Sequence, residues 1–210
     1  MKSIKVVTLS VLFVVSFITV GYLVARGHKH QGNQGFTLYM TQTSYPPTRE
    51  PILTANKVRY QKGDGSWKLE TTYSNGRKDD GFGQPARGVF HVDEKNRRLD
   101  YLSESGVYAP TEEQLRNNPG FVGEEVILGY KTFHIHTVSE INSDDYVDSY
   151  VCLALQGYPI KSVSGSKNGF KTVFETTKVI LGEPSFQVPA YPVDMGRYNQ
   201  IHGTTASSPQ

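Results

Sequence analysis

The chain has 210 residues, a formal net charge of +2 and one cysteine, Cys152. The positive charge includes Lys2, Lys5 and Arg26, so the rest of the chain carries no basic excess, which argues against nucleic acid as a partner. One cysteine excludes an intramolecular disulfide, so a hydrophobic core must hold the fold together.

The N-terminal segment predicts delivery to a membrane. Lys2 and Lys5 precede an uncharged, mostly apolar run at 6–25, and as a helix this run spans about 30 Å, the thickness of a bilayer's hydrocarbon core. It is longer than the apolar core of a typical cleaved signal. We therefore expect residues 1–27 to be a single-pass anchor in the cell inner membrane, with the body in the periplasm or outside the cell. The alternative is a cleaved signal sequence and a secreted body.

The rest of the chain divides by composition. Residues 28–35 are polar and are expected to form a tether, whereas residues 195–210 lack apolar periodicity and are expected to be disordered. Between them, residues 36–194 form the expected β-rich envelope domain, because short alternating runs separated by turn residues predict one curved antiparallel sheet. The predicted strands are 36–43, 54–61, 66–74, 88–93, 98–103, 126–128, 131–138, 146–155, 159–163 and 170–180.

Sorting apolar from polar side chains across each turn predicts how the strands pair. The expected pairs are Tyr60 with Trp67, Val58 with Leu69, Phe90 with Tyr101, Val92 with Leu99, Phe133 with Val151, Ile135 with Ser149, His134 with Tyr150 and His136 with Asp148. The apolar members, together with Leu153, are expected to line the concave side of the sheet. Asn75-Gly76 suits the positive φ angles of a two-residue turn. Asp79-Asp80 and residues 81–83 are also interpreted as turns.

One short helix is predicted. Thr111 is its expected N-cap, Gln114 completes a capping box, and Asn118-Pro119-Gly120 ends it. This helix and residues 119–126 are expected to cover the concave side, and any apolar stripe left uncovered is expected to bind a ligand. The candidate ligand-binding residues are Tyr60, Trp67, Phe90 and Tyr101.

His134 and His136 are the sharpest candidates for chemistry, because their rings project from one face of a strand. The predicted pairing places Asp148 beside them, so two imidazoles and a carboxylate share one surface. One interpretation is a zinc or copper site. The other is the polar, solvent-facing side of a hairpin.

The sequence has no catalytic signature. Cys152 lacks an assigned base, and no set of nucleophile, base and orienting residue can be assembled. We therefore expect a non-enzymatic protein without a cofactor.

Three short patterns in the second half carry a family resemblance. They are EVILGYKTF at 125–133, LQGYPIK at 155–161, and VILGEP at 179–184 followed by FQVP at 186–189. These resemble bacterial envelope proteins related to the LolA-like lipoprotein-carrier superfamily. The resemblance implies a strongly curved antiparallel sheet, or half-barrel, around helical or loop segments.

The resemblance also implies a function in binding rather than catalysis. Members of the superfamily bind acyl chains, lipoproteins or partner proteins. The expected function is thus a non-catalytic envelope protein that presents a curved sheet to an apolar or lipid-bearing ligand. The alternative is a structural accessory subunit of a membrane-associated assembly that has no small ligand and docks an envelope protein partner.

Overall fold

The computed structural model describes residues 34–85, 87–104, 109–140 and 142–196 of the chain. The predicted anchor at 1–27 lies outside these ranges, as do residues 28–33 of the expected tether and 197–210 of the expected tail. Within the described ranges, none of the helices is long and apolar enough to span a bilayer.

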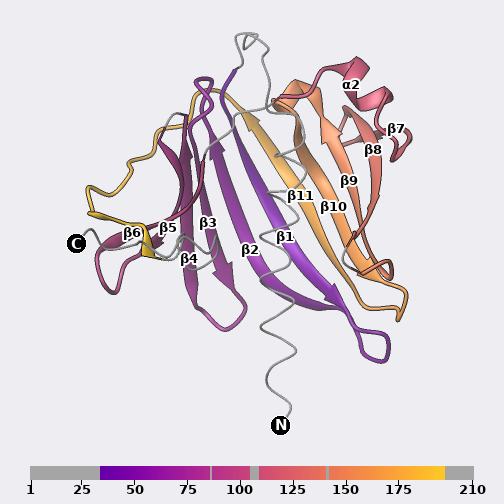
Figure 1. Ribbon diagram of the computed structural model, residues 1–210, viewed down its shortest axis with the longest axis horizontal. Helices are drawn as coiled ribbons and strands as arrows, with labels where there is room; N and C mark the ends of the chain where they lie inside the picture. Colours follow the sequence, from indigo (N-terminus) through magenta and orange to yellow (C-terminus); the bar gives the residue numbers. More distant parts are fainter. Residues whose placement is uncertain (1–33, 86, 105–108, 141, 197–210) are drawn as a thin grey trace, which may run out of the picture.

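The described residues form one open, curved sheet of 12 strands (Figure 1). The strands are β1 (Phe36–Tyr45), β2 (Ile52–Gln61), β3 (Trp67–Tyr73), β4 (Lys78–Gln84), β5 (Gly88–Asp93), β6 (Arg98–Ser103), β7 (Phe121–Ile127), β8 (Tyr130–Val138), β9 (Asp145–Cys152), β10 (Tyr158–Ser166), β11 (Lys171–Leu181) and β12 (Val193–Asp194). They lie in the order β12-β6-β5-β4-β3-β2-β1-β11-β10-β9-β8-β7. All neighbours are antiparallel except β12, which runs parallel to β6. The predicted curved antiparallel sheet is confirmed.

Strand β4 corrects the prediction of turns at Asp79-Asp80 and residues 81–83. Acidic residues and glycines are depleted in strands, so this segment has little strand propensity of its own. It is a strand because it pairs with β3 on one side and β5 on the other. Gly83 lies opposite Trp67, and a Cβ atom at Gly83 would collide with the indole ring.

The turn between β2 and β3 also differs from the prediction. The Lys62 amide donates to the Ser66 carbonyl at 2.8 Å, and Gly65 adopts a left-handed φ of 89°. This is the geometry of a hairpin loop that ends in a glycine bulge, and it moves β3 by one residue against β2. Tyr60 therefore pairs with Lys68 and not with Trp67. Because a shift of one residue reverses the faces of a strand, Tyr60 and Trp67 lie on opposite sides of the sheet.

The other predicted pairings are confirmed outside this hairpin. Phe90 pairs with Tyr101, Val92 with Leu99, Phe133 with Val151, Ile135 with Ser149, His134 with Tyr150 and His136 with Asp148. The turn after β3, in contrast, is longer than the predicted two-residue turn. The Tyr73 amide donates to the Arg77 carbonyl at 2.8 Å, and within this turn only Gly76 has a positive φ, at 80°.

We name one face of the sheet the helix face, because helix α2 (Glu112–Arg116) packs on it. Leu115 of this helix contacts Phe133, Ile135 and Val151. The predicted capping box is present, since the Gln114 amide donates to Thr111 Oγ1 and the Thr111 amide donates to Gln114 Oε1, at 3.2 and 2.8 Å. The helix therefore covers the β8 end of this face, as Figure 1 also shows.

We name the second face the tail face, because residues 182–196, the C-terminal strap, cover it. Val188 and Tyr191 of the strap pack against a cluster on the opposite end of the sheet, formed by Phe82, Phe90, Val92, Leu99 and Tyr101. In Figure 1 the strap is the yellow segment that runs from β11 across to β12 beside β6.

The side chains expected together on the concave side are divided between these two faces. Antiparallel partners share a face, and the pairings can be followed from strand to strand across the sheet. Val58, Tyr60, Phe90, Val92, Leu99 and Tyr101 lie on the tail face, whereas Trp67, Leu69, Phe133, Ile135 and Val151 lie on the helix face. Leu153 leaves the sheet, because a short 3-10 turn, η1 (Leu153–Leu155), follows β9.

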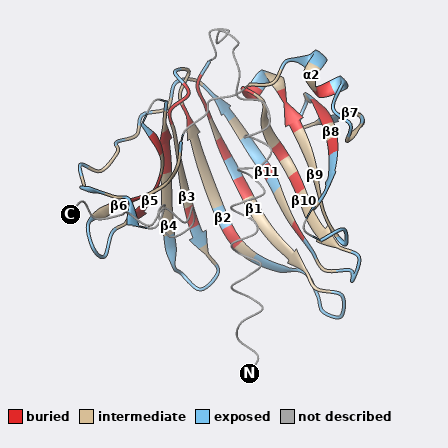
Figure 2. Cartoon of the chain, in the orientation of Figure 1, coloured by how far each residue is buried: buried red, intermediate tan, exposed pale blue. Residues whose placement is uncertain are grey.

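The centre of the described core lies on β1. Phe36, Leu38 and Met40 alternate along this strand and are all buried. They pack with Ile160 and with Leu155 of η1. Buried positions recur along the central strands in Figure 2, while exposed positions occupy most loops and parts of β11.

Candidate functional site

The predicted ligand stripe does not form one continuous surface. Tyr60 lies on the tail face, with its ring centroid 6.3 Å from that of Phe186 in the strap. Phe90 stacks on Phe82 at 5.0 Å and meets the edge of Tyr101 at 5.5 Å. The strap covers this aromatic group, so three of the four predicted ligand residues belong to an internal packing interface.

The strap is fixed by polar contacts at both ends. The Gly63 amide donates to Glu183 Oε2 at 3.1 Å, and the Leu99 amide donates to the Pro192 carbonyl at 2.9 Å. The Tyr191 hydroxyl donates to Glu94 Oε2 at 2.8 Å. These contacts hold the strap over the β4, β5 and β6 end of the tail face.

Trp67, the fourth predicted ligand residue, forms a cation–aromatic stack on the helix face. The Arg59 guanidinium lies between two rings, 4.5 Å from the Trp67 ring centre and 4.3 Å from that of Tyr158. Its Nε and Nη2 atoms donate to Gln61 Oε1 at 3.2 and 2.8 Å. Burial lowers the pKa of Arg59. The cation is thus held by aromatic rings and a neutral amide, without a carboxylate partner among the described residues.

Lys57 lies two residues before Arg59 on the same face of β2. Its Nζ atom is 4.6 Å from the ring centre of Phe174. Within the described residues the ammonium has neither a hydrogen bond nor an ion pair. Burial lowers the pKa of Lys57 from 10.5 to about 8, against the opposing attraction of Asp79. An ammonium in this setting is a candidate ligand-binding group, because burying an unpaired charge is unfavourable.

A row of paired residues crosses the helix face at Lys57. In order along the row they are Asp79, Thr71, Lys57, Met40 and Thr176. Thr71, Met40 and Thr176 are buried, and Thr176 Oγ1 has no hydrogen-bond partner among the described atoms. Met40 is therefore flanked by a cation and a hydroxyl that both lack a polar partner within the described chain.

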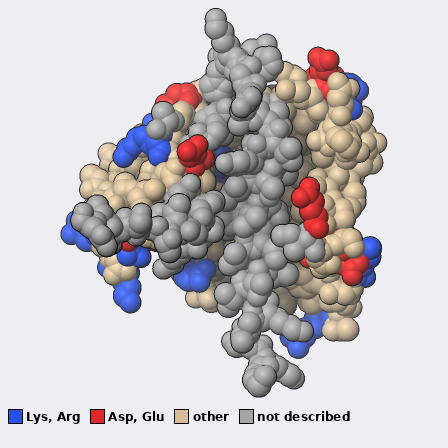
Figure 3. Space-filling view, viewed as in Figure 1, with Lys and Arg blue, Asp and Glu red and all other residues tan. Residues whose placement is uncertain are grey.

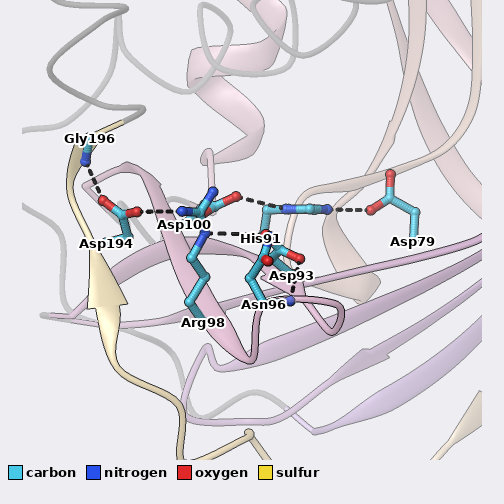
Figure 4. A network of polar contacts seen from close by, with 8 residues as sticks. All are labelled: Asp79, His91, Asp93, Asn96, Arg98, Asp100, Asp194 and Gly196. Atoms are coloured by element: carbon cyan, nitrogen blue, oxygen red, sulfur yellow. Dashed lines mark hydrogen bonds and ion pairs between the residues drawn. The ribbon is translucent and has the colours of Figure 1, made fainter.

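At the end of the row, Asp79 belongs to a charge network that links β4, β5, β6 and β12 (Figure 4). His91 bridges two carboxylates, with Nε2 2.6 Å from Asp79 Oδ1 and Nδ1 3.3 Å from Asp100 Oδ2. Arg98 lies 2.9 Å from Asp100 and 2.9 Å from Asp194. Burial favours a higher pKa for Asp79, but the hydrogen bond and charge of His91 outweigh it and the pKa is lowered.

The sequence interpretation misses this network because it places Asp79 in a turn. Part of the network is accessible from sequence, since the predicted pairing of 88–93 with 98–103 already places His91 opposite Asp100. The contact with Asp79 depends on β4, which the sequence does not indicate.

His134, His136 and Asp148 come together as predicted, on the tail face at the other end of the sheet. His134 Nε2 and His136 Nδ1 both lie 2.9 Å from the same oxygen, Asp148 Oδ1. His134 stacks on Tyr150, with ring centroids 4.4 Å apart. The contacts are hydrogen bonds to a shared carboxylate oxygen. The described part of the chain contains no group of His, Cys, Asp or Glu side chains arranged to hold a metal ion, so the zinc or copper interpretation gains no geometric support.

Cys152 is fully buried and free. Burial raises the pKa of its thiol, an effect that backbone hydrogen bonds partly oppose. A buried, protonated thiol is a packing group and not a nucleophile.

Charge on the surface is mixed in sign. In the view of Figure 3, blue and red side chains of the described residues are interspersed around the rim of the sheet. One such group lies beside α2, where Lys131 Nζ is 3.3 Å from Glu112 and 3.1 Å from Glu124. These charges pair with one another, in contrast to Lys57.

No family model matches the chain, and no curated protein matches its sequence. Among solved structures, an uncharacterised conserved protein from Thermus thermophilus matches with a TM-score of 0.50 at 8% identity, covering 89% of this chain and 99% of that one. A LolA superfamily protein from Nitrosomonas europaea matches with a TM-score of 0.40 at 11% identity, covering 73% of this chain and 88% of that one.

MucB from Pseudomonas aeruginosa, solved in complex with MucA, matches with a TM-score of 0.43 at 13% identity. The match covers 75% of this chain and 54% of the matched chain, so this protein spans about half of that structure's length. At 8% identity, the likeness to the Thermus thermophilus protein is one of fold.

Proposed function

We propose that this chain is a non-catalytic binding protein of the cell envelope, held at the membrane by residues 1–27, whose helix face binds an apolar or lipid-bearing ligand. One observation carries the proposal. Lys57 and Arg59 lie on an apolar face against the rings of Phe174, Trp67 and Tyr158, without a carboxylate partner in the described part of the chain. Apolar walls with a few convergent polar groups are typical of ligand sites.

Two further features support the proposal. The strap covers the tail face over β4, β5 and β6, where three of the predicted ligand residues lie, and it does not cover Lys57 and Arg59 on the helix face. The resemblance of residues 125–133, 155–161 and 179–189 to the LolA-like superfamily agrees with an envelope location and a binding role.

The single tryptophan of the chain, Trp67, allows a direct test. Bromine quenches indole fluorescence only at close range, so dibromostearic acid or its methyl ester quenches Trp67 if either binds on the helix face. We expect saturable quenching of the full chain in a nonionic detergent, reversed by an excess of unbrominated stearic acid. Absence of quenching by both probes would contradict the proposed function.

Neighbouring residues of β11 supply matched variants. Phe174 lies on the helix face and Val173 on the tail face, and both are half-buried. Phe174→Ala should weaken the quenching several-fold, by about 1 kcal/mol or more of lost apolar contact. Val173→Ala should leave it unchanged. Equal losses in the two variants would mean that the probe does not use the helix face.

The edge strand β7 favours the alternative of a structural accessory subunit. It is the last strand in the sheet order and pairs with β8. Val122 and Val126 on it are 60% and 74% exposed. An exposed strand edge with apolar side chains is a surface to which a partner protein can add a strand. Val126→Lys should then disrupt a native membrane complex without changing the quenching of Trp67.

A further inference from the structure

Lys57 has an acidic neighbour that does not neutralise it. Asp79 is near enough to raise the pKa of Lys57, but it forms no ion pair with Lys57. Its Oδ1 atom lies 2.6 Å from His91 Nε2, and its Oδ2 atom accepts the Tyr73 hydroxyl at 3.4 Å. Asp79 is thus oriented by His91 and Tyr73, and none of the described carboxylates forms an ion pair with Lys57, so the ammonium is available to an anion from outside the described chain.

Arg59 is a weaker candidate for the same task. Its guanidinium is stacked between two rings and donates to Gln61. Two of its donor atoms are therefore used, and its position is fixed by neighbours. Lys57 keeps its ammonium donors unused against the single ring of Phe174.

Thr176 adds a second unused polar group at the same level of the sheet. Lys57 and Thr176 both pair with Met40, from β2 and β11 on either side of β1. Two strand spacings separate their Cα atoms by about 10 Å, and the flexible Lys57 side chain can reach across part of that distance. An acidic group placed above Met40 can accept hydrogen bonds from both Lys57 Nζ and Thr176 Oγ1.

We propose that the ligand of the helix face is a lipid-like amphiphile with an acidic headgroup, and that Lys57 and Thr176 bind this headgroup. The inference rests on the proposed function. The apolar chain lies along the helix face over Phe174 and the neighbouring apolar residues, while the headgroup forms a charge-assisted hydrogen bond with the Lys57 ammonium. Such bonds are stronger than neutral ones and give selectivity for the charged form of the headgroup.

Dibromostearic acid and its methyl ester test the inference, because they share one chain and differ only in the headgroup. At neutral pH the full chain should bind the acid about tenfold more tightly than the ester, the factor expected from one charge-assisted hydrogen bond. Lys57→Met should abolish this preference. Lys57→Arg should retain the preference, and Thr176→Val should reduce it.

Lys68→Met is the matched control. Lys68 lies on the neighbouring strand and the opposite face, where it pairs with Glu70 at 2.8 Å. This variant should keep the full preference. Equal affinity of the wild-type chain for acid and ester would overturn the headgroup inference and leave the proposed function standing. A preference that survives in Lys57→Met would overturn the assignment to Lys57, and failure of both probes would overturn the proposed function itself.

Discussion

At the scale of single residues, Lys57 stands out because its half-buried ammonium has no ion pair within the described residues. A half-buried ammonium without an ion pair disfavours the folded state, because desolvation of its charge is not compensated. Strands usually present such residues to water or pair them with carboxylates, as Lys68 does with Glu70 and Asp80. Retention of an unfavourable charge at one position is typical of binding sites, where stability and function compete.

We therefore predict that Lys57→Met stabilises the full chain at neutral pH. A pKa lowered from 10.5 to about 8 corresponds to at most roughly 3 kcal/mol, and solvent screening of a half-buried group reduces this to about 1–2 kcal/mol. Thermal or denaturant unfolding measures the gain. Lys78→Met, at an exposed position, should change stability by less than about 0.5 kcal/mol. A destabilised Lys57→Met chain would contradict the prediction.

The gain in stability from Lys57→Met should depend on pH. Between the folded pKa of about 8 and the unfolded value of 10.5, the unfolded chain holds a proton that the folded chain has released. The destabilising contribution of Lys57 therefore decreases, and the stability of the wild-type chain rises, as the pH increases across this window. The advantage of Lys57→Met should be full below about pH 8 and should decline as the pH approaches 10.5.

At the scale of elements, the loop between β2 and β3 decides which side chains share a face. A left-handed residue at Gly65 closes this loop, and only the resulting register brings Arg59 and Trp67 together. Strand β4 then makes room for the indole through Gly83. The stack of Arg59 on Trp67 thus depends on the loop between β2 and β3 and on Gly83 of β4.

We predict that Gly65→Ala destabilises the chain by about 1–2 kcal/mol, because a side chain disfavours the left-handed conformation. Gly63→Ala, in the same loop but without a positive φ, is the control and should have a smaller effect. Denaturant unfolding of the two variants gives the comparison. Similar losses would show that the left-handed residue does not determine the stability of this loop.

At the scale of the whole molecule, the sheet is covered at opposite ends on opposite faces. Helix α2 packs on the helix face over β8, and the strap packs on the tail face over β4, β5 and β6. Arg98 connects the strap to the sheet through Asp194, and His91 connects the same network to β4. Each face is thus covered by a different segment, and the strap lies on the face opposite Lys57 and Arg59.

Independence of the two faces is testable at Tyr191. Tyr191→Ala removes strap packing and the hydrogen bond to Glu94, so it should lower the free energy of unfolding. Tyr191→Phe removes the hydrogen bond alone and should cause a smaller loss. Neither variant should change the affinity of dibromostearic acid measured by Trp67 quenching. A loss of affinity equal to that of Phe174→Ala would contradict the division of roles between the faces.

The sequence by itself determined the local features of this protein. Alternation of apolar residues located most strands, the box formed by Thr111 and Gln114 located the helix, and side-chain sorting paired His136 with Asp148 and Phe90 with Tyr101. These features depend on residues close in the chain or joined by one turn, where propensity and periodicity act directly.

Only the tertiary structure decided what those features form together. The turn after Gln61 contains a bulge that apolar sorting cannot detect, so sorting assigns Tyr60 and Trp67 to one face although they lie on two. Strand β4 exists because two neighbouring strands supply its hydrogen-bond partners, despite its low intrinsic propensity. The strap covers Phe90 and Tyr101 of the predicted ligand stripe from far along the chain, since Tyr191 lies 90 positions after Tyr101. The sequence did not single out Lys57 either. Whether a lysine forms an ion pair depends on the strands packed around it, and the periodicity of one strand does not specify those neighbours.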